Sequence, residues 1–201
     1  MVAASEIASR QTGLTTLWHQ IAPPPSSPVA AGTPAQRLLL LAEQNHRCNF
    51  CLWHEEDAAR CEDVATVCQA KRAIDRLNQE RNNLTEAMDQ ALVDALQPPA
   101  SGCPCNSESP GMIIDRLSIL ALKEYHMHEE SVRADASADH RARSAEKLAL
   151  VRRQRHDLIT SLDELLADVA ARRRTFAVYF QFKMYNDPAL NPRLYRHPAR
   201  A

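Results

Sequence analysis

The stretch PGMIIDRLSILALKEYHM, residues 110–127, decides the fold of this chain. On a helical wheel, its apolar side chains occupy almost every direction around the axis. Such a helix must be covered on all sides by other elements, so we expect it to lie at the centre of the molecule. Its few polar side chains then face little water and need partners or a ligand. The apolar residues include Ile113, Ile114, Leu117, Ile119, Leu120 and Leu122, and the polar ones include Asp115, Arg116, Lys123 and His126.

Prolines and capping residues divide the rest of the chain into further helices. Only four glycines occur in 201 residues, which disfavours folds rich in β-hairpins. We predict an all-α protein, an antiparallel bundle of five to six helices, two of them long. The expected helices span residues 4–21, 34–60, 62–96, 110–133, 137–172 and 175–185. The predicted single domain, 1–201, comprises an N-terminal helix with a Pro-rich connector (1–33), a first long helix pair (34–97), a loop (98–109), a second helix pair plus a short helix (110–185) and a tail (186–201).

Charge and hydropathy limit the partners and the compartment. The 24 basic and 25 acidic residues are mixed along the chain, so nucleic acid is not an expected partner. No apolar run reaches the roughly 18 residues of a membrane span, and the N-terminus lacks the order of a secretory leader. We therefore expect a cytoplasmic protein whose cysteines are reduced. The sequence is compatible with a monomer and with a homo-oligomer. Zinc at Cys48, Cys51, Cys103 and Cys105 is disfavoured, because a predicted helix carries the first pair and a distant loop the second.

The second predicted helix turns polar side chains toward its apolar face. At 100° per residue, Asn45, Asn49 and Glu56 fall on the face formed by its leucines. Trp53 and Arg60 lie at the margin of that face. Burying such groups without partners costs several kcal/mol, so they should be hydrogen-bonded, charge-paired or part of a site. The same wheel places His54, Asp57 and Cys61 on the opposite side.

The third predicted helix carries a matching polar stripe with a spacing of three to four residues. The stripe consists of Lys71, Asp75, Asn78 and Asn82, and Arg81 is embedded in the apolar face beside it. Consecutive helices joined by a short loop pack side by side. The two stripes are therefore expected to face each other across an interhelical cleft.

Four blocks of the sequence resemble the signature of a bacterial family of all-helical proteins of unknown function. They are LWHEEDAAR (52–60), KRAIDRLNQERNNLTEAMD (71–89), PGMIIDRLSILALKEYHM (110–127) and FQFKMYNDPALNP (180–192). The resemblance implies a genetic setting beside glycosyltransferases and other surface-glycan genes. Where the family more usually has Arg-Asn-Asp, this chain has Arg81-Asn82-Asn83 and so lacks that acid. The positions that the resemblance marks are Asn49, Trp53, Glu56, Asp57, Arg60, Lys71, Asp75, Asn78, Asp115, Arg116, Lys123, His126, Lys183 and Asn186.

These features predict a polar cleft that binds a phosphorylated or otherwise anionic small molecule, such as a nucleotide or a nucleotide sugar. The resemblance adds surface-glycan metabolism as the setting. Cationic side chains suit phosphate, amides suit sugar hydroxyls, and carboxylates suit acid–base or Mg²⁺ chemistry. The predicted ligand-binding residues are Arg60, Lys71, Arg81, Arg116, Lys123 and Lys183, the amides Asn49, Asn78 and Asn186, and Trp53 and His126. The predicted catalytic acids are Glu56, Asp75 and Asp115.

Two other functions are open at this stage. A non-catalytic partner of a glycosyltransferase would use its long helices for docking and its polar stripes only for internal contacts. An enzyme similar to the helical nucleotide pyrophosphohydrolases would hold Mg²⁺ between two adjacent helices. The ligands would then be Glu56, Asp57, Asp75 and Asn78. An open pocket lined by the stripes would favour ligand binding, and a closed seam would favour the partner.

Overall fold

The computed structural model, which describes residues 2–27, 32–182 and 187–195, consists mostly of helices. The helices are α1 (Ala4–Trp18), α2 (Pro34–Ala58), α3 (Val64–Leu96), α4 (Pro110–Val132), α5 (Ala138–Ala170) and the one-turn α6 (Pro192–Tyr195). The two-residue strands β1 (Cys105–Asn106) and β2 (Thr175–Phe176) pair in parallel. The predicted helical class is confirmed apart from this small sheet. The bounds of α1 to α5 fall within three residues of the predicted ones.

Side-chain caps fix where four of these helices begin. Thr33 Oγ1 accepts a hydrogen bond from Gln36 N at 3.2 Å, and Gln36 Oε1 accepts one from Thr33 N at 3.0 Å. This capping box precedes α2. Asp63, Ser109 and Ser137 accept a backbone N–H at the starts of α3, α4 and α5. A cap of this kind contributes about 1 kcal/mol to stability.

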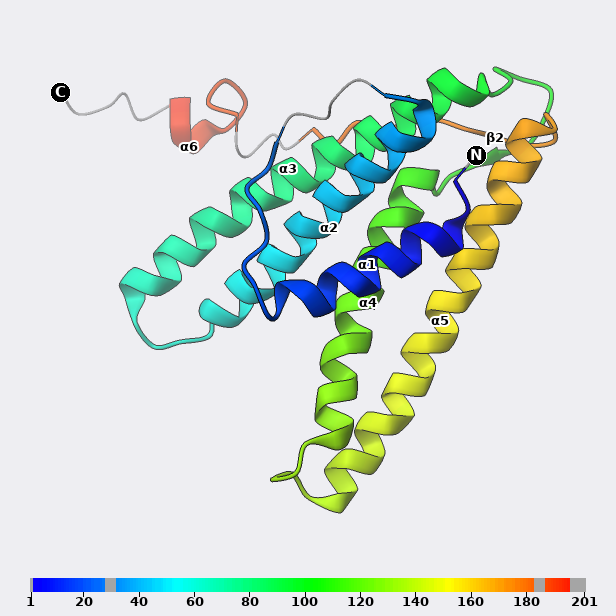
Figure 1. The fold of residues 1–201 in the computed structure, drawn as a ribbon. Coiled ribbons are helices and arrows are strands. Elements are labelled where there is room, and N and C mark those ends of the chain that lie inside the picture. Colours follow the sequence, from blue (N-terminus) through cyan, green and yellow to red (C-terminus); the bar gives the residue numbers. More distant parts are fainter. Residues whose placement is uncertain (1, 28–31, 183–186, 196–201) are drawn as a thin grey trace.

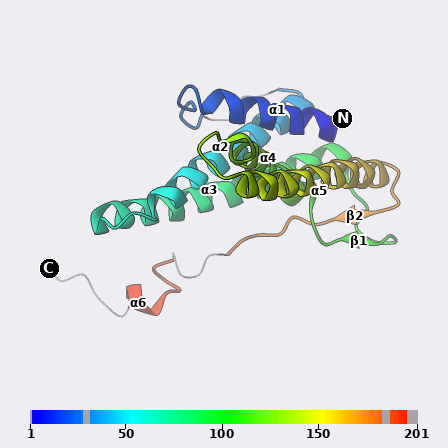
Figure 2. The same ribbon diagram turned by 90° about the horizontal axis from the view of Figure 1, so that it is seen from below.

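The long helices form two hairpins that diverge from a shared end. α2 lies beside α3 and α4 lies beside α5, and the two pairs splay apart toward their tips (Figure 1). α1 packs against α2, α4 and α5 on one side of the molecule, whereas β1 and β2 lie on the other (Figure 2). The structure therefore does not confirm a single antiparallel bundle, because the two hairpins point in different directions.

α4 lies at the centre of the fold, as its sequence predicts. It contacts each of α1, α2, α3 and α5. Ile114 and Leu117 of α4, Met88 of α3 and Leu162 of α5 are fully buried in one core cluster. Burial of such a side chain stabilises a protein by about 1.5–3 kcal/mol. The core thus joins the two hairpins through α4.

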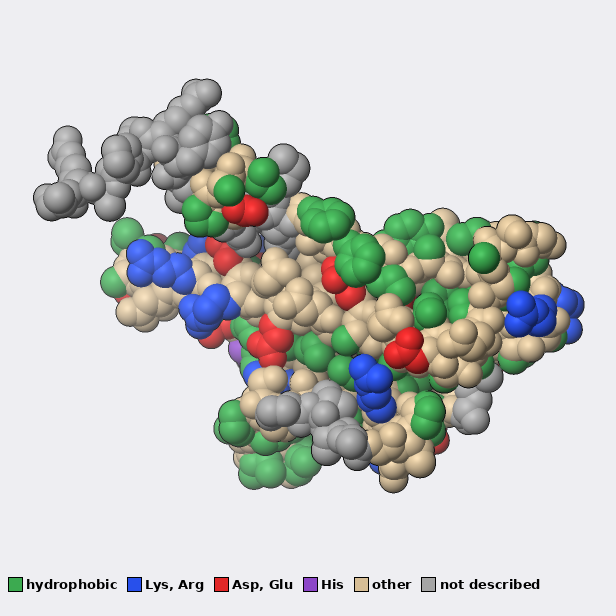
Figure 3. All heavy atoms as spheres, turned by 90° about the horizontal axis from the view of Figure 1, so that it is seen from above, with side chains coloured by type: hydrophobic (Ala, Val, Ile, Leu, Met, Phe, Trp, Pro, Cys, Tyr) green, Lys and Arg blue, Asp and Glu red, His purple; other side chains and the backbone are tan. Residues whose placement is uncertain are grey.

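The surface carries charges of both signs. On the face shown in Figure 3, Lys and Arg side chains are interspersed with Asp and Glu and do not gather into a basic patch. That face therefore lacks the stripe of positive charge typical of a nucleic-acid footprint. None of the described helices is both long and apolar enough to cross a membrane.

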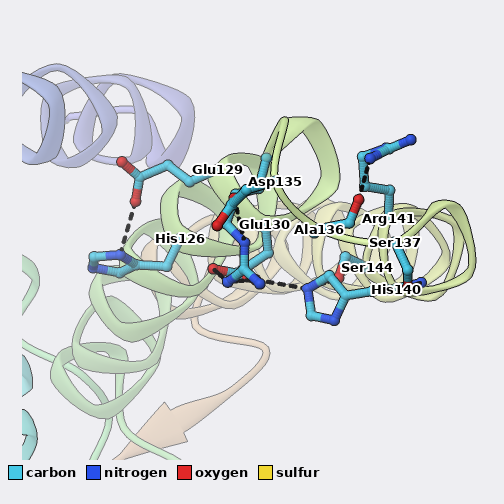
Figure 4. Close-up of polar contacts among 10 residues, drawn as sticks. His126, Glu129, Glu130, Asp135, Ala136, Ser137, His140, Arg141 and Ser144 are labelled. Atoms are coloured by element: carbon cyan, nitrogen blue, oxygen red, sulfur yellow. Dashed lines mark hydrogen bonds and ion pairs between the residues drawn. The ribbon is translucent and has the colours of Figure 1, made fainter.

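An ion-pair cluster joins the end of α4 to the start of α5 (Figure 4). Glu130 Oε2 accepts hydrogen bonds from Arg133 Nη1 at 2.9 Å and from His140 Nε2 at 2.6 Å. Arg133 Nε also lies 3.2 Å from Asp135 Oδ1. Exposed ion pairs of this kind add little stability, so we expect this cluster to contribute at most about 1 kcal/mol per pair.

The predicted short helix at residues 175–185 is wrong for its described part. Thr175 and Phe176 form β2, and residues 177–182 continue without helical structure. Phe176 is buried in the core, and Gln181 N donates a hydrogen bond to Glu86 Oε1 at 2.8 Å. The segment TFAVYF is rich in β-branched and aromatic residues, which favour extended backbone.

A buried carboxylate joins α3 to the start of α4. Asp89 accepts hydrogen bonds from Ser109 Oγ at 2.5 Å and from Gly111 N at 2.6 Å. Position 111 requires glycine, because a Cβ atom there would lie 2.5 Å from Thr85 O. Burial raises the pKa of Asp89 to about 6, although its two hydrogen bonds act in the opposite direction. The ionised form is therefore less favoured in the folded state than in the unfolded chain.

The substitution Asp89→Asn is expected to remove a pH dependence of stability. The pKa of Asp89 is about 6 in the folded protein and about 3.9 in the unfolded chain. The folded state therefore binds the proton more tightly, and wild-type stability falls by roughly 2–3 kcal/mol through this group as the pH rises from about 4 to about 6. In urea denaturation across this window, the unfolding free energy of Asp89→Asn should rise by roughly 2–3 kcal/mol relative to that of the wild type, because His46 and other groups titrate alike in both proteins. The exposed Asp94→Asn is the control, and an equal slope in wild type and Asp89→Asn would contradict the prediction.

Candidate ligand-binding site

The inner part of the polar stripe on α2 is closed by hydrogen bonds to α4. Asp115 Oδ1 accepts from Asn45 Nδ2 and from Asn49 Nδ2, both at 2.9 Å. Asn49 Nδ2 also lies 3.0 Å from Ser118 Oγ. Asn45, Asn49 and Ser118 are buried. This inner network satisfies its own polar groups and acts as a contact between helices.

His46 extends the inner network toward α1. Its Nδ1 lies 2.8 Å from Ser118 Oγ, and its Nε2 lies 3.0 Å from Thr15 Oγ1. Thr15 donates its hydroxyl proton to Gln11 O at 2.8 Å, so it accepts from His46 Nε2–H. Nδ1 then accepts a hydrogen bond from Ser118 Oγ. This network assigns His46 the tautomer that carries its proton on Nε2. Burial, followed by the charge of Arg155, lowers the pKa of His46 to about 3. The imidazole is therefore neutral at neutral pH.

The sequence prediction did not include His46 or Ser118. The signal for His46 was present, because it stands one turn after Ala42 and two turns after Leu38 on the apolar face of α2. Ser118 gave no comparable signal, since a single hydroxyl in an apolar helix often bonds its own backbone. Only the packing of α2 on α4 brings the two side chains together.

The outer part of the stripe borders a cavity of about 340 Å³ lined by α2, α3 and α4. This volume lies at the lower end of the range of small-molecule sites, roughly 300–1,000 Å³. We call it the Trp53 cavity. Its lining residues are Asn49, Leu52, Trp53, Glu56 and Asp57 of α2, Asn78 and Arg81 of α3, and Ile119 and Leu122 of α4.

Three polar side chains at the Trp53 cavity lack an internal partner. Glu56, Asp57 and Asn78 make no side-chain hydrogen bond or ion pair within the described part of the chain. The wheel placed Asp57 on the opposite side of the helix, but the structure brings it to the cavity. Asp57 stands one turn after Trp53 on α2, so both side chains reach the same cavity. These groups are available to a ligand.

Arg81 links the inner network to the Trp53 cavity. Its Nε lies 3.6 Å from Asp115 Oδ1, and its Nη1 donates to Asn49 Oδ1 at 3.5 Å. Its side chain is 27% exposed and also lines the cavity. The guanidinium group has five N–H donors, so these two contacts leave donors for a ligand.

An aromatic and histidine cluster supports Trp53. The ring of His126 stacks on the indole, with ring centroids 4.6 Å apart and 8° between the planes. His126 Nδ1 lies 3.1 Å from Glu129 Oε2 (Figure 4), and the rings of His19 and His54 pack beside it. Burial, followed by the nearby His19, lowers the pKa of His126. At neutral pH His126 is thus mainly a neutral packing partner of Trp53.

The predicted cationic residues do not converge on the Trp53 cavity. Lys71 pairs with Asp75 on the exposed side of α3. Arg116 Nη1 lies 2.6 Å from Glu108 Oε1. Arg60 is exposed just beyond the end of α2. Among the predicted cations, the structure places Arg81 alone at this cavity, within the described residues.

The remaining predicted site residues are separated from one another. Lys123 lines a different cavity, between α4 and α5. Lys183 and Asn186 lie outside the described residues. Of the predicted catalytic acids, Glu56 lines the Trp53 cavity, whereas Asp115 is held in the inner network.

The Trp53 cavity offers two carboxylates to a metal ion, Glu56 and Asp57. In the described ranges, no three His, Cys, Asp or Glu side chains are arranged to hold a metal ion. Glu56 and Asp57 could hold Mg²⁺ only together with oxygen atoms of a ligand or water. The six cysteines are free, and burial raises the pKa of Cys48 to about 12, so it is a neutral thiol at neutral pH.

A family model matches most of the chain. The model, described as a protein of unknown function (DUF4254), matches residues 39–178. This span contains every lining residue of the Trp53 cavity. No curated protein and no solved structure matches the chain. The match agrees with the resemblance in the sequence to a family of unknown function and brings no reaction with it.

Proposed function

The chain belongs to the DUF4254 family of proteins of unknown function, and from its site we propose that the Trp53 cavity binds a small phosphorylated ligand with a hydroxylated ring, such as a sugar phosphate. One observation carries the proposal. Glu56, Asp57 and Asn78, three polar groups without internal partners, border a single cavity with an apolar wall. Asn78 is half-buried and the two carboxylates are exposed, so a ligand in the cavity can take the place of water on all three groups.

The lining of the cavity suits a ring that is apolar on its faces and polar at its edge. Trp53 offers a rigid aromatic surface, held from behind by His126. Carboxylates accept hydrogen bonds from hydroxyl groups, and an amide both donates and accepts. Glu56, Asp57 and Asn78 can therefore bind hydroxyls around a ring that packs against Trp53. The cavity of about 340 Å³ suits one ring with its phosphate.

The charges of the cavity limit how anionic its contents can be. Arg81 is the cation of this cavity that can bind a phosphate, but Asp115 partly neutralises its charge. Glu56 and Asp57 repel additional negative charge. We therefore assign a single phosphate to the side of Arg81 and the hydroxyl groups to the side of the carboxylates.

A Mg²⁺-assisted function is the second candidate, supported by the adjacent Glu56 and Asp57 at the same cavity. Mg²⁺ is commonly bound by one or two carboxylates together with substrate phosphates. Asp75, the third acid of the predicted set, pairs with Lys71 and does not line the cavity. Of the arrangement typical of the pyrophosphohydrolases, this candidate keeps only one part, in which Glu56 and Asp57 hold Mg²⁺ against a phosphate of the ligand.

A non-catalytic partner of a glycosyltransferase is the third candidate. The closed inner network favours it, because Asn45, Asn49 and Asp115 are used for contacts between helices. The open Trp53 cavity favours ligand binding. We prefer ligand binding because the partner function gives no role to Glu56 and Asn78 at that cavity.

The substitution Asn78→Ala is expected to weaken the binding of glucose 1-phosphate by about five- to tenfold, the effect of losing one or two hydrogen bonds. Isothermal titration calorimetry, with and without Mg²⁺, measures this change. Asn83→Ala, an exposed substitution on the same helix, is the matched control and should bind like the wild type. If binding requires Mg²⁺, Glu56→Gln should lose most of the affinity. Adding Mg²⁺ should then no longer increase the binding of this variant.

Two outcomes would contradict the proposed function. The first is the absence of binding by glucose 1-phosphate and related sugar phosphates, seen both by calorimetry and as an unchanged melting temperature. A ligand at 100 times its dissociation constant should stabilise the fold by about 2.7 kcal/mol, which melting would detect. The second is an equal loss of affinity in Asn78→Ala and Asn83→Ala, which would place the ligand elsewhere.

A further inference from the structure

A second cavity, of about 440 Å³, lies between α4 and α5. We call it the Lys123 cavity. Its apolar lining residues are Ile119, Leu120 and Leu158, and its polar ones are Arg116, Lys123, Gln154, Asp157 and Ser161. Its mixture of apolar and polar groups is similar to that of the Trp53 cavity and is suited to a small molecule.

The two cavities adjoin at a single side chain, because Ile119 lines both of them. On α4, Arg116 and Lys123 stand two turns apart on one stripe and line the Lys123 cavity. Leu122, three residues beyond Ile119, lines the Trp53 cavity. Ile119 thus stands between the two faces of α4, and its side chain is the part of the wall that the two cavities share.

Charge is divided unequally between the two cavities. The Trp53 cavity has one cation and two carboxylates, whereas the Lys123 cavity has two cations and one carboxylate. Lys123 makes no hydrogen bond or ion pair with any described residue, so its full charge is available. Arg116 shares its charge with Glu108. A group with two negative charges is therefore favoured at the Lys123 side of Ile119 and disfavoured among Glu56 and Asp57.

We propose that the two cavities form one extended site for a ligand of two ring units joined by a diphosphate, as in a nucleoside diphosphate sugar. This inference rests on the proposed function, because one ring occupies the Trp53 cavity. The diphosphate passes Ile119 between Arg81 on one side and Lys123 on the other. The second ring lies in the Lys123 cavity, where Gln154 can bind its polar edge.

The substitution Lys123→Gln tests the extended site by calorimetry with uridine diphosphate glucose and with glucose 1-phosphate. Removing the unpaired cation should weaken the diphosphate compound by about tenfold and leave the one-ring compound within about twofold of the wild type. Lys147→Gln, which removes an exposed lysine of α5, is the matched control and should leave both affinities unchanged. Asn78→Ala should weaken both compounds.

Each contrary result has a distinct meaning. If glucose 1-phosphate binds but the diphosphate compound binds no tighter, or is unaffected by Lys123→Gln, the extended site is overturned and the proposed function stands. If Lys123→Gln weakens both compounds equally, the single phosphate already lies at Lys123 and the two-ring assignment is overturned. If neither compound binds, the proposed function fails and the extended site fails with it.

Discussion

Lowering the pH from 7 to 4 is expected to reduce the free energy of unfolding by about 3 kcal/mol through His46 alone. The pKa of His46 is about 3 in the folded protein and about 6.5 in the unfolded chain. The unfolded state therefore binds the proton between these values, and stability falls as the pH drops below about 6.5. The physical reason is that His46 is fully buried and its Nδ1 already accepts a hydrogen bond from Ser118 Oγ.

Urea denaturation of the wild type and of His46→Gln at pH 7 and pH 4 measures this effect. Glutamine keeps a donor and an acceptor but does not titrate. The difference in unfolding free energy between the two proteins should shift by about 3 kcal/mol in favour of His46→Gln at pH 4. Comparing two variants also cancels the opposite contribution of Asp89. The exposed His156→Gln is the control, and a difference that is the same at both pH values would show that His46 is not buried and neutral.

The substitution Asp115→Ala is expected to lower the free energy of unfolding by about 2–4 kcal/mol, the cost of removing an acceptor shared by two buried amides. Asp115 is 14% exposed in its side chain and accepts from both Asn45 and Asn49. Without it, two buried amides lose their acceptor and Arg81 loses its counter-charge. The inner network between α2 and α4 would then be left with unpaired polar groups.

Two further variants define the cause of this loss. Asp115→Asn retains an acceptor oxygen and the volume of the side chain, so we expect it to lose less stability than Asp115→Ala. Asp139→Ala removes an exposed carboxylate that pairs with Arg143 and should cost less than about 1 kcal/mol. A loss for Asp115→Ala as small as that for Asp139→Ala, by urea denaturation, would mean that the network does not stabilise the fold.

Much of the fold could be predicted because its signals are local. Thr33, Asp63, Ser109 and Ser137 cap helices where the sequence indicated helix starts, and prolines mark the intervening breaks. The helix predicted from residue 175 onward is wrong, because Phe176 packs into the core and β2 pairs with β1. That pairing depends on a loop 70 positions earlier in the chain, which local propensity does not encode. The divergence of the two hairpins is likewise a property of tertiary packing.

The candidate site was only partly predictable, because a wheel gives directions but not neighbours. The inward positions of Asn49 and Asn78 followed from periodicity, and the structure places both at the Trp53 cavity. α4 is apolar on nearly every side, so its wheel could not tell that Arg116 and Lys123 face α5. Asp57 reaches the cavity because it stands one turn after Trp53, and the wheel could not tell that the cavity extends past Trp53 at the margin of the face.

The indole N–H resonances of the two tryptophans give the most direct test of binding at the Trp53 cavity. Trp53 lines that cavity, whereas Trp18 is buried against His46 and Phe50, and Trp18→Phe assigns the two signals. During a titration with glucose 1-phosphate, the ¹⁵N-resolved signal of Trp53 should shift and saturate at the dissociation constant found by calorimetry. The signal of Trp18 should move far less. Saturating ligand that leaves the Trp53 signal in place would contradict a ligand site at this cavity.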